Sequence, residues 1–421
     1  MYDVIIIGGG PAGLMASIAA AEAGAKTLLL EKMDKPARKL RITGKGRCNI
    51  TNVKDVEEFM QHIFPDAMFF KEAFSRFSNR DLIDFINLIG IETVVERGDR
   101  VFPSSRSAPV LVDALISYAI SKKVHLSSRS EVTRLIRRED RIVEVEYRWG
   151  ERLCRNFAKT FIVATGGLSY PATGCTGDGY AFARSVQISV IPQRPSLTPL
   201  FISDAGQPRS LSIRNASLRL KADNRKVQEE FGEMEFCGRY VSGPCVLRLS
   251  RKAGELLLQK SKVTLSIDFK PALSAHKLRL RIERELAEAP SNVGLGYLLG
   301  KLMPRDLSFA FATRFQLDQG KNIHDADKSD IEKIVFGLKE YSLHIVGIGS
   351  FDDAIVTAGG VSLFGIHSDS MRAKKVDNLY FAGEVLDLDA DTGGYNLQIA
   401  FSTGYLAGIS AALSLGKSRD K

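Results

Sequence analysis

The chain begins Met1-Tyr-Asp-Val-Ile-Ile-Ile-Gly8-Gly-Gly10-Pro-Ala-Gly13, and this stretch decides the fold. The β-branched run before Gly8 predicts a buried parallel strand. Gly8 permits a tight turn, Gly10 lets the backbone approach a diphosphate, and Gly13 lets the following helix press against the strand. The residues expected at the diphosphate are Gly8, Gly10, Pro11, Ala12 and Gly13.

The residues after this turn complete a dinucleotide-binding unit. The alanine-rich stretch 14–23 predicts a helix that ends at Gly24, a residue suited to a helix C-terminus. A second apolar strand over 27–30 leads to Glu31, whose carboxylate can accept hydrogen bonds from the adenosine ribose. A glycine pattern alone is weak evidence, but here strand, turn, helix, strand and acid occur in the required order. We therefore predict an α/β fold with a Rossmann-like dinucleotide site.

The N-terminal run does not fit a signal peptide or a membrane helix. No cationic region precedes it, Asp3 lies inside it, and glycines interrupt it. No other stretch is long and apolar enough to span a bilayer, so we expect a soluble protein without membrane association.

The composition fits a cytoplasmic enzyme of several domains. The 421 residues with 44% hydrophobic content suffice for two or three domains. The five cysteines are odd in number and form no C-x-x-C pair, which argues against a disulfide framework or a zinc site. The six histidines are scattered without ligand spacing, so we expect no metal.

The net charge of +9 leaves two interpretations open. Residues 35–47 carry six cations and no acid, and residues 194–252 are also rich in lysine and arginine. Such runs form either an ordinary solvated face or a surface for RNA or another phosphate ligand. The sequence does not decide between them.

A second group of motifs, near the C-terminus, identifies the dinucleotide. Residues 377–384 predict a strand that ends in Gly383 and the acid Glu384, and a Gly-Gly turn at 393–394 precedes a small-residue helix. The acid can bind ribityl hydroxyls, and the helix N-terminus can stabilise negative charge at the pyrimidine edge of a reduced flavin. A third strand and glycine turn lies at 161–167. Together the three units indicate FAD.

Several blocks of sequence resemble one flavoprotein family. They are GKGRCNITN at 44–52, ATGG at 164–167, PATGCTGDGY at 171–180, TAGGV at 357–361, GEVLD at 383–387 and GGYNLQ at 393–398. They resemble the YhiN-like family of the glutathione-reductase-like superfamily, which includes BaiN-like and aminoacetone-oxidase-like flavoproteins. The resemblance spans nearly the whole chain. It implies bound FAD, a three-domain build and redox chemistry, with proposed activities that range over amine oxidation, reduction of steroid enones and reduction of a uridine in ribosomal RNA to dihydrouridine.

The block at 44–52 also has a physical interpretation. Its glycines allow a loop to pass close to a cofactor, and Arg38, Lys39 and Arg47 supply charge for the diphosphate. Cys48 has two interpretations. Neighbouring cations can lower the pKa of its thiol, which suits a proton donor or redox partner, or it is a buried small side chain that supports the loop.

The predicted cofactor site draws on all of these motifs, with Val132 added by analogy with the family as a backbone contact to the adenine. Cys48 is the candidate catalytic residue, and Tyr170 and Tyr395 are the other polar groups expected near the flavin ring. The residues predicted to bind the cofactor are Gly8, Gly10, Pro11, Ala12, Gly13, Glu31, Lys32, Arg38, Lys39, Gly44, Gly46, Arg47, Cys48, Asn49, Val132, Ala164, Thr165, Gly166, Gly383, Glu384, Asp391, Gly394, Tyr395, Asn396, Leu397 and Gln398.

The flavin motifs predict the domain organisation. Residues 1–190 and 350–421 carry them and form a discontinuous FAD-binding domain. Strand-like alternation predicts an inserted β-rich domain over 191–270 and 339–349. An amphipathic helical pattern from Ser274 onward predicts a small helical domain over 271–338.

Three functions remain open. A reductase would take electrons from NAD(P)H and reduce a C=C bond, with a uridine of ribosomal RNA as one acceptor held by the basic insertion. An oxidase would oxidise a small amine-type substrate with O₂. A non-catalytic flavin- or RNA-binding protein would not need the complete set of flavin motifs. No second G-x-G-x-x-G occurs, so NADH or NADPH would visit the flavin only transiently. We favour the reductase, and the oligomeric state is not predicted.

Overall fold

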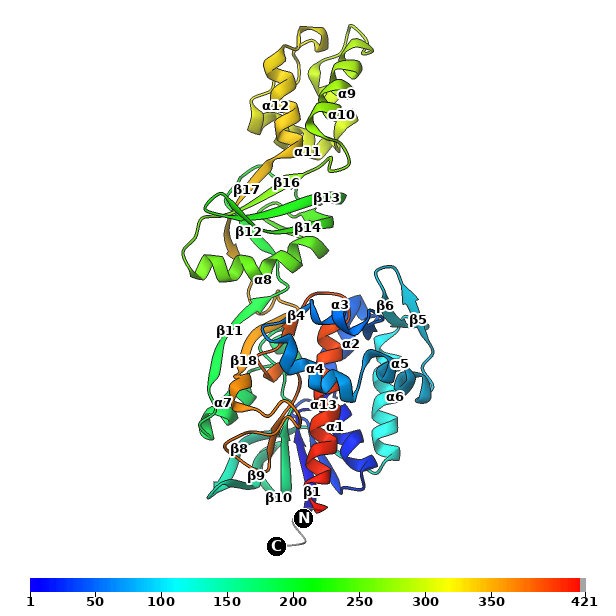
Figure 1. The fold of residues 1–421 in the computed structure, drawn as a ribbon, viewed down its shortest axis with the longest axis vertical. Coiled ribbons are helices and arrows are strands. Elements are labelled where there is room, and N and C mark those ends of the chain that lie inside the picture. The colour runs from blue at the N-terminus through cyan, green and yellow to red at the C-terminus, as the bar shows by residue number, and fades with distance from the viewer. Residues whose placement is uncertain (417–421) are drawn as a thin grey trace. The chain divides into compact units, whose positions relative to one another are not determined.

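The computed structural model describes residues 1–416. The chain divides into two units, each with its own core: unit 1 is Met1–Arg194 with Ile355–Lys421, and unit 2 is Pro195–Ala354. The α/β fold class predicted from the sequence is confirmed, since a parallel Rossmann-like sheet, a separate small barrel and helices are all present (Figure 1).

A seven-stranded sheet forms the centre of unit 1. Strands β7, β2, β1, β10 and β19 run parallel, whereas β9 and β8 extend the sheet in antiparallel fashion from β10. The glycine turn follows β1, and Val4 to Ile7 before it are buried, as the apolar run predicts. The bounds are β1 (Tyr2–Ile7), β2 (Thr27–Leu30), β7 (His125–Ser127), β8 (Ser130–Arg138), β9 (Arg141–Trp149), β10 (Arg152–Val163) and β19 (Leu379–Phe381).

Shorter strands and helices cover this sheet. The strands are β3 (Thr51–Asn52), β4 (Ile63–Phe64), β5 (Thr93–Glu96), β6 (Arg100–Pro103), β11 (Val190–Ser196), β18 (Val356–Val361) and β20 (Asp389–Ala390). The helices are α1 (Pro11–Glu22), α2 (Arg38–Ile42), α3 (Val56–Met60), α4 (Ala67–Arg76), α5 (Asn79–Leu88), α6 (Ala108–Ser121), α7 (Asp178–Ser185) and α13 (Tyr395–Leu413).

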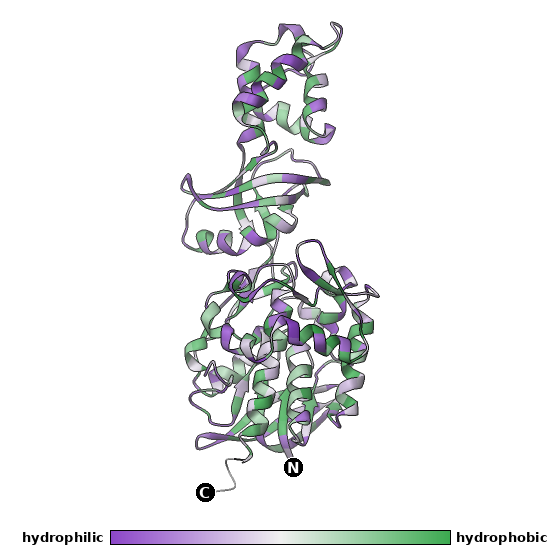
Figure 2. Cartoon of the chain, turned by 45° about the vertical axis from the view of Figure 1, so that its right-hand side comes forward, coloured by the Kyte–Doolittle hydropathy of each residue, from purple (hydrophilic) through white to green (hydrophobic). Residues whose placement is uncertain are grey.

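The first and last helices of unit 1 pack closely together. A Cβ at Gly404 or Gly408 of α13 would lie 2.4 or 2.3 Å from the carbonyl oxygen of Ala12 or Ala16 of α1. Only glycine permits this approach, so α1 and α13 meet backbone to backbone. Hydrophobic residues (green) concentrate in the central strands and helices of unit 1 (Figure 2). The two helices run in the same direction, and α13 extends beyond the N-terminal end of α1.

Unit 2 contains a closed barrel with strand order β12-β15-β14-β13-β16-β17. Its helix α8 (Pro244–Leu258) packs on β14. Leu218, Leu265 and Leu343 fill the interior of the barrel. The strand bounds are β12 (Leu200–Ile202), β13 (Leu211–Ala222), β14 (Arg225–Phe236), β15 (Tyr240–Ser242), β16 (Val263–Asp268) and β17 (Tyr341–Ile348).

Four helices are inserted between strands β16 and β17 of the barrel and share the core of unit 2. They are α9 (Ala275–Ala287), α10 (Leu295–Leu302), α11 (Arg305–Phe315) and α12 (Lys328–Lys339). Arg314 of α11 donates to Asp204 at 2.8 Å, which ties the helices to the loop after β12. Barrel and helices are thus one folded unit.

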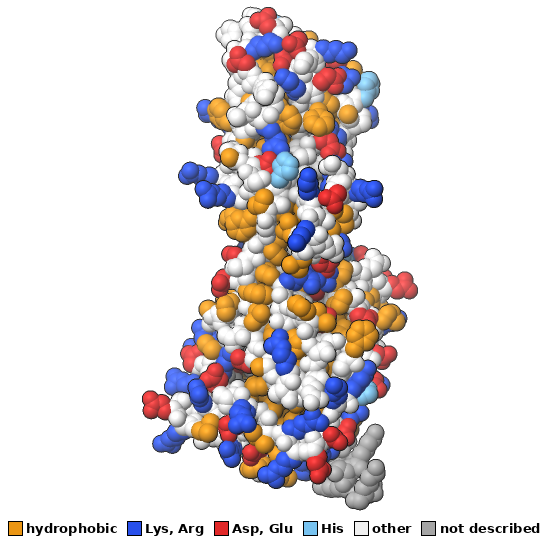
Figure 3. Space-filling view, turned by 90° about the vertical axis from the view of Figure 1, so that its left-hand side faces the viewer, with side chains coloured by type: hydrophobic (Ala, Val, Ile, Leu, Met, Phe, Trp, Pro, Cys, Tyr) orange, Lys and Arg blue, Asp and Glu red, His pale blue; other side chains and the backbone are white. Residues whose placement is uncertain are grey.

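Ion pairs neutralise many of the cations that the sequence places in the barrel. Arg219, Lys221, Lys226, Arg248 and Arg251 each pair with a glutamate. On the face shown in Figure 3, cationic (blue) and acidic (red) side chains are interspersed. The basic run of the insertion therefore does not form one continuous cationic surface there.

Candidate functional site

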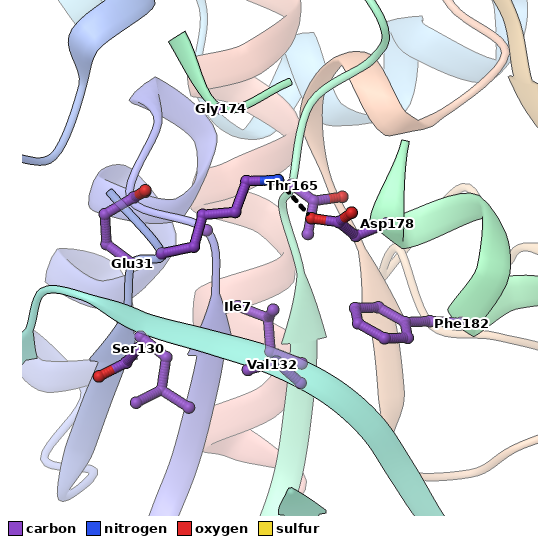
Figure 4. Close-up of a pocket in the computed structure, with 11 residues that line it drawn as sticks. Ile7, Glu31, Ser130, Val132, Thr165, Gly174, Asp178 and Phe182 are labelled. Atoms are coloured by element: carbon purple, nitrogen blue, oxygen red, sulfur yellow. Dashed lines mark hydrogen bonds and ion pairs between the residues drawn. The ribbon is translucent and has the colours of Figure 1, made fainter. Parts of the chain in front are cut away.

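A pocket lies at the end of β1 and β2, where the first glycine turn begins (Figure 4). Parallel strands commonly bind ligands at their carboxyl ends. The lining residues come from β1, β2, β8, the end of β10 and α7, and are Ile7, Gly8, Leu30, Glu31, Lys32, Ser130, Val132, Thr165, Gly174, Asp178 and Phe182. The sequence predicted five of them, Gly8, Glu31, Lys32, Val132 and Thr165, to share one site.

Glu31 ends β2 and is held by the glycine turn itself. The backbone N–H groups of Gly9 and Met33 each donate to its carboxylate at 2.7 Å. Burial raises the pKa of Glu31, although these donors and the charges of Lys32 and Arg38 oppose the shift. The carboxylate is therefore fixed in the pocket with lone pairs left for a ligand hydroxyl.

Lys32 crosses the same pocket and pairs with Asp178 at 2.6 Å, as the dashed line in Figure 4 marks. Its ammonium also contacts the hydroxyl of Thr176. Asp178, Ser130 and Phe182 were not among the predicted site residues. Asp178 lies in a Thr-Gly-Asp-Gly turn at the start of α7. This turn could have indicated a site residue, but it entered the prediction only through the family resemblance.

The glycine turn has the geometry of an anion site. Gly8 has φ of 102°, and a Cβ at Gly13 would lie 1.8 Å from the carbonyl oxygen of Gly8, so both positions require glycine. A Cβ at Gly10 would have no atom within 4 Å. Pro11 and Ala12 start α1, whose first N–H groups point out of its N-terminus. The space beside Gly10 is the space that a diphosphate needs.

Lys39 and Glu384 form the second part of the site. The ammonium of Lys39 donates to both carboxylate oxygens of Glu384, at 2.8 and 3.0 Å, and to Ser169 Oγ at 3.0 Å. Glu384 also accepts from Ser169 Oγ and from the backbone N–H of Thr357. The ring of Tyr170 lies 5.9 Å from the ammonium. Lys39 thus faces the acid of the C-terminal motif.

Two of the predicted diphosphate cations lie beside acids in this structure. Arg38 is 3.8 Å from Asp34, and the guanidinium of Arg47 contacts Glu96 and lies 4.4 Å from the ring centre of Phe102. Gly44 and Gly46 shape the turn before Arg47, with φ of 57° and 83°. The charge of Arg38 also acts on Glu31 of the pocket, and the convergence of Arg38, Lys39 and Arg47 on one diphosphate stays a prediction.

Cys48 is fully buried, with 0% of its surface exposed. Burial raises the pKa of its thiol to about 12, so the expectation of a lowered pKa was wrong. Loss of hydration raises the pKa of the Cys48 thiol, and Arg47 does not lower it because its guanidinium is directed toward Glu96. This environment supports the second interpretation, in which Cys48 is a small buried side chain that holds the loop.

The N-terminus of α13 forms the third part of the site, after Gly383 and Gly394, with φ of 78° and 103°. The side chain of Asn396 bonds to the backbone of Ala390, and Gln398 bonds to Thr51 and Ser402. Leu397 is half-buried. These side chains hold the turn in place, which leaves its backbone N–H groups as donors to a ligand.

A histidine that the sequence analysis passed over lies at this turn. His62 Nδ1 is 2.8 Å from a carboxylate oxygen of Asp391, and its ring stacks on Tyr395 at 4.4 Å between centroids. The antiparallel pairing of β4 with β20 brings them together across more than 300 positions. No local sequence pattern could have indicated this contact.

Among the buried side-chain atoms of residues 1–416 that have no hydrogen-bond partner, three belong to predicted site residues. They are Arg47 Nε, Thr165 Oγ1, which follows β10 and Ala164, and Asn49 Oδ1, which follows Cys48. Burying such atoms without a hydrogen bond is costly. A Cβ at Gly166 would lie 3.1 Å from Cys175 Sγ, so the turn after Thr165 is tightly packed. The orphaned atoms, the open space at Gly10 and the fixed Glu31 carboxylate all fit FAD.

Residues 1–416 contain neither a cluster of metal ligands nor a membrane-spanning helix. No group of three or more His, Cys, Asp or Glu side chains there can hold a metal ion. No helix in that range has the length and apolar character needed to cross a bilayer.

Residues 2–410 match the family model described as HI0933-like protein Rossmann domain. The chain belongs to this family. HI0933-like proteins are FAD-dependent oxidoreductases, so the family resemblance, the FAD cofactor and the enzyme class predicted from the sequence are confirmed at the level of the family. The chain is 29% identical to a 3-dehydro-bile acid delta(4,6)-reductase of Clostridium scindens, over 98% of this chain and 99% of that protein. It is also 29% identical to a ribosomal RNA dihydrouridine synthase of Escherichia coli, over 96% of each.

Solved structures show the same fold at low identity. A 3-ketosteroid delta1-dehydrogenase from Sterolibacterium denitrificans is 13% identical with a TM-score of 0.54, over 98% of this HI0933-like chain and 99% of that chain. A quinol-fumarate reductase is 14% identical with a TM-score of 0.54, over all of this chain and 72% of that one. These likenesses concern the fold alone.

Proposed function

We propose that this chain is a flavin-dependent reductase that takes electrons from NAD(P)H and reduces a C=C bond conjugated to a carbonyl group, with a uridine of ribosomal RNA as an acceptor. The observation that carries the proposal is the full-length similarity to two enzymes whose names describe such reductions. A steroid enone and the uracil ring share a C=C bond next to a carbonyl, so one flavin chemistry serves both.

The three parts of the site receive complementary roles in this proposal. Glu31 binds the adenosine ribose, and the space at Gly10 with the N-terminus of α1 receives the diphosphate. The unpartnered Thr165 Oγ1 donates or accepts a hydrogen bond, and the unpartnered Asn49 Oδ1 accepts one. The N-terminus of α13 stabilises negative charge at the pyrimidine edge. When bound, FAD supplies an acceptor and donor of hydride.

A reduction of this type also needs a proton at the second carbon, and the chain offers His62 for it. Cys48 is unsuited because its buried thiol holds its proton up to a pH of about 12. His62 is half-buried at the α13 turn and is oriented by Asp391 at 2.8 Å, an arrangement that suits proton transfer. His62→Gln should slow reduction of the acceptor while NADPH still reduces the flavin.

Anaerobic reduction tests the proposal directly. NADH or NADPH should bleach the flavin absorbance of the purified protein, and adding an enone or ribosomal RNA should restore it. Mass analysis of ribosomal RNA from cells that lack the protein should show a loss of dihydrouridine. Rapid oxidation of a simple amine with peroxide release, and no reoxidation by either acceptor, would contradict the proposal.

A further inference from the structure

Arg47 of the GKGR loop lies close to arginines of the neighbouring β5–β6 hairpin and of the residues that follow it. We define the basic cluster as Lys45, Arg47, Arg97, Arg100 and Arg106. Arg97 and Arg100 lie on the turn and second strand of the β5–β6 hairpin, which Figure 1 shows at the edge of unit 1, and Arg106 follows it. All five residues belong to unit 1.

Shared contacts hold Arg47, Arg100 and Arg106 close together. The guanidinium carbons of Arg47 and Arg100 lie 4.4 and 5.9 Å from the ring centre of Phe102, so the two charges are at most about 10 Å apart. That separation is within the range of ionic screening at 0.1 M salt, which is about 10 Å. Arg47 and Arg106 both face Glu96, Arg106 at 3.4 Å. The cluster therefore concentrates like charge.

Few acids offset this charge. Glu96 is shared between two arginines, and Asp99 on the hairpin turn lies 3.8 Å from Lys54 instead. Arg106 is 68% exposed, and Lys45, Arg97 and Arg100 are exposed as well. Arg47 Nε is buried and has no hydrogen-bond partner within the described part of the chain. An anion bound here would accept hydrogen bonds from the cations of the cluster and would reduce the repulsion between their charges.

The loop that carries the cluster also carries the flavin site. Lys45 and Arg47 precede Asn49, whose Oδ1 is buried without a partner between residues 1 and 416. Lys45 lies between Gly44 and Gly46 in a left-handed turn. Its φ is 58°, and its side chain is exposed. A polyanion on the cluster would thus lie next to the residues proposed to meet the flavin.

We propose that the basic cluster binds the phosphate backbone of the RNA whose uridine is reduced. This inference rests on the proposed function and names the surface that holds its acceptor. It differs from the expectation drawn from the sequence, which placed the RNA on the inserted β-domain. In unit 2, Arg219 and Lys221 share Glu340, and Lys226, Arg248 and Arg251 each pair with a glutamate. In the cluster, by contrast, no ion pair within residues 1–416 involves Lys45, Arg97 or Arg100.

The test compares two triple variants that remove the same charge. Arg97→Gln/Arg100→Gln/Arg106→Gln removes three cations of the cluster, and Arg138→Gln/Arg148→Gln/Arg152→Gln removes three exposed cations of β8, β9 and β10. Anisotropy of a fluorescein-labelled, 30-nucleotide single-stranded RNA is measured from 50 to 300 mM KCl. The cluster variant should bind at least tenfold more weakly, and its salt slope should fall by about 2, at about 0.7 per lost phosphate contact. The control should change less than twofold.

Three outcomes would overturn the inference: equal weakening in both variants, unchanged binding in the cluster variant, or binding of wild type to anionic lipid vesicles but not to RNA. Flavin content and thermal unfolding establish that each variant is folded. Bleaching of the flavin by NADPH and its reoxidation by a small enone are measured on the same proteins. If these persist without RNA binding, only the inference fails. If they are absent in wild type, the proposed function fails, whatever the RNA result.

Discussion

Lys39 and Glu384 are 345 positions apart, yet the ammonium of Lys39 lies 2.8 and 3.0 Å from the two carboxylate oxygens of Glu384. Both side chains are about four-fifths buried. The pair joins α2 to the motif after β19 and so holds together the second part of the flavin site.

Removing one partner of this pair should destabilise unit 1. Lys39→Met leaves the carboxylate of Glu384 with only Ser169 and the N–H of Thr357 as donors. We expect a loss of about 1–3 kcal/mol in the free energy of unfolding, because a buried charge loses its counterion. Urea denaturation of the FAD-free protein measures it. Lys39→Met/Glu384→Gln should lose less than the sum of the single variants, and strict additivity would refute the coupling.

Two alanine substitutions in the glycine turn should separate folding from cofactor binding. Gly13→Ala places a Cβ 1.8 Å from a carbonyl oxygen, so it should cost roughly 1–3 kcal/mol of stability or prevent folding. Gly10→Ala meets no atom within 4 Å, so thermal unfolding without FAD should not change. Its affinity for FAD should fall at least ~10-fold, or 1.4 kcal/mol, as measured by fluorescence titration. Unchanged affinity would mean that the diphosphate does not lie there.

Thr165→Val tests whether the unpartnered hydroxyl of Thr165 binds FAD. Because Thr165 Oγ1 has no hydrogen-bond partner in residues 1–416, replacing it with a methyl group should leave the stability of the FAD-free protein equal or higher. If the hydroxyl binds FAD, affinity should fall by about 2- to 10-fold, the value of one hydrogen bond. Thr173→Val, at a hydroxyl already bonded to the carbonyl oxygen of Tyr170, is the control. A stability loss in Thr165→Val with unchanged FAD affinity would contradict the assignment.

The dinucleotide fold was predictable because its determinants are local. The apolar run before Gly8, the close approach at Gly13 and the acid at the end of β2 all lie within 31 residues, and each has a steric or hydrogen-bonding reason. The same holds for the Gly-Gly turn before α13. Strand periodicity in the insertion likewise predicted β structure, although closure into a barrel depends on pairing between distant strands such as β12 and β17.

Side-chain partners were not predictable because they depend on contacts between distant segments. The sequence assigned Arg47 to a diphosphate, but the β5–β6 hairpin provides Glu96, 49 positions away. It gave Cys48 a lowered pKa from nearby cations, whereas packing removes water and raises it. His62 meets Asp391 only because β4 pairs with β20. The sequence predicted a cationic insertion, but ion pairs with glutamates offset several of its positive charges, as at Arg219 and Arg248.

Cys48→Ala should leave the flavin chemistry intact. Cys48 is fully buried and its thiol has a pKa of about 12, so it is not a thiolate at neutral pH. We expect NADPH-dependent bleaching within twofold of wild type and a stability loss of about 1 kcal/mol from the small cavity. Iodoacetamide at pH 8 should modify Cys154 before Cys48 in native protein, as peptide mass mapping would show. A 100-fold loss of bleaching in folded Cys48→Ala would restore the catalytic interpretation.

The stability of unit 2 should depend on pH through Asp204. Burial alone would raise the pKa of Asp204, but hydrogen bonds from Arg314 and from the backbone N–H of His344, together with their charges, lower it overall. A carboxyl group whose pKa is lowered by folding stabilises the native state above its usual pKa near 3.8, and that contribution is lost as the pH falls through the folded value.

Asp204→Asn should therefore reduce the free energy of unfolding by about 1–3 kcal/mol at pH 7. The difference between wild type and variant should shrink below pH 4 in urea denaturation at successive pH values. Asp223→Asn, at the exposed turn between β13 and β14, is the matched control, and a difference that stays constant down to pH 2 would show that Asp204 does not carry the effect.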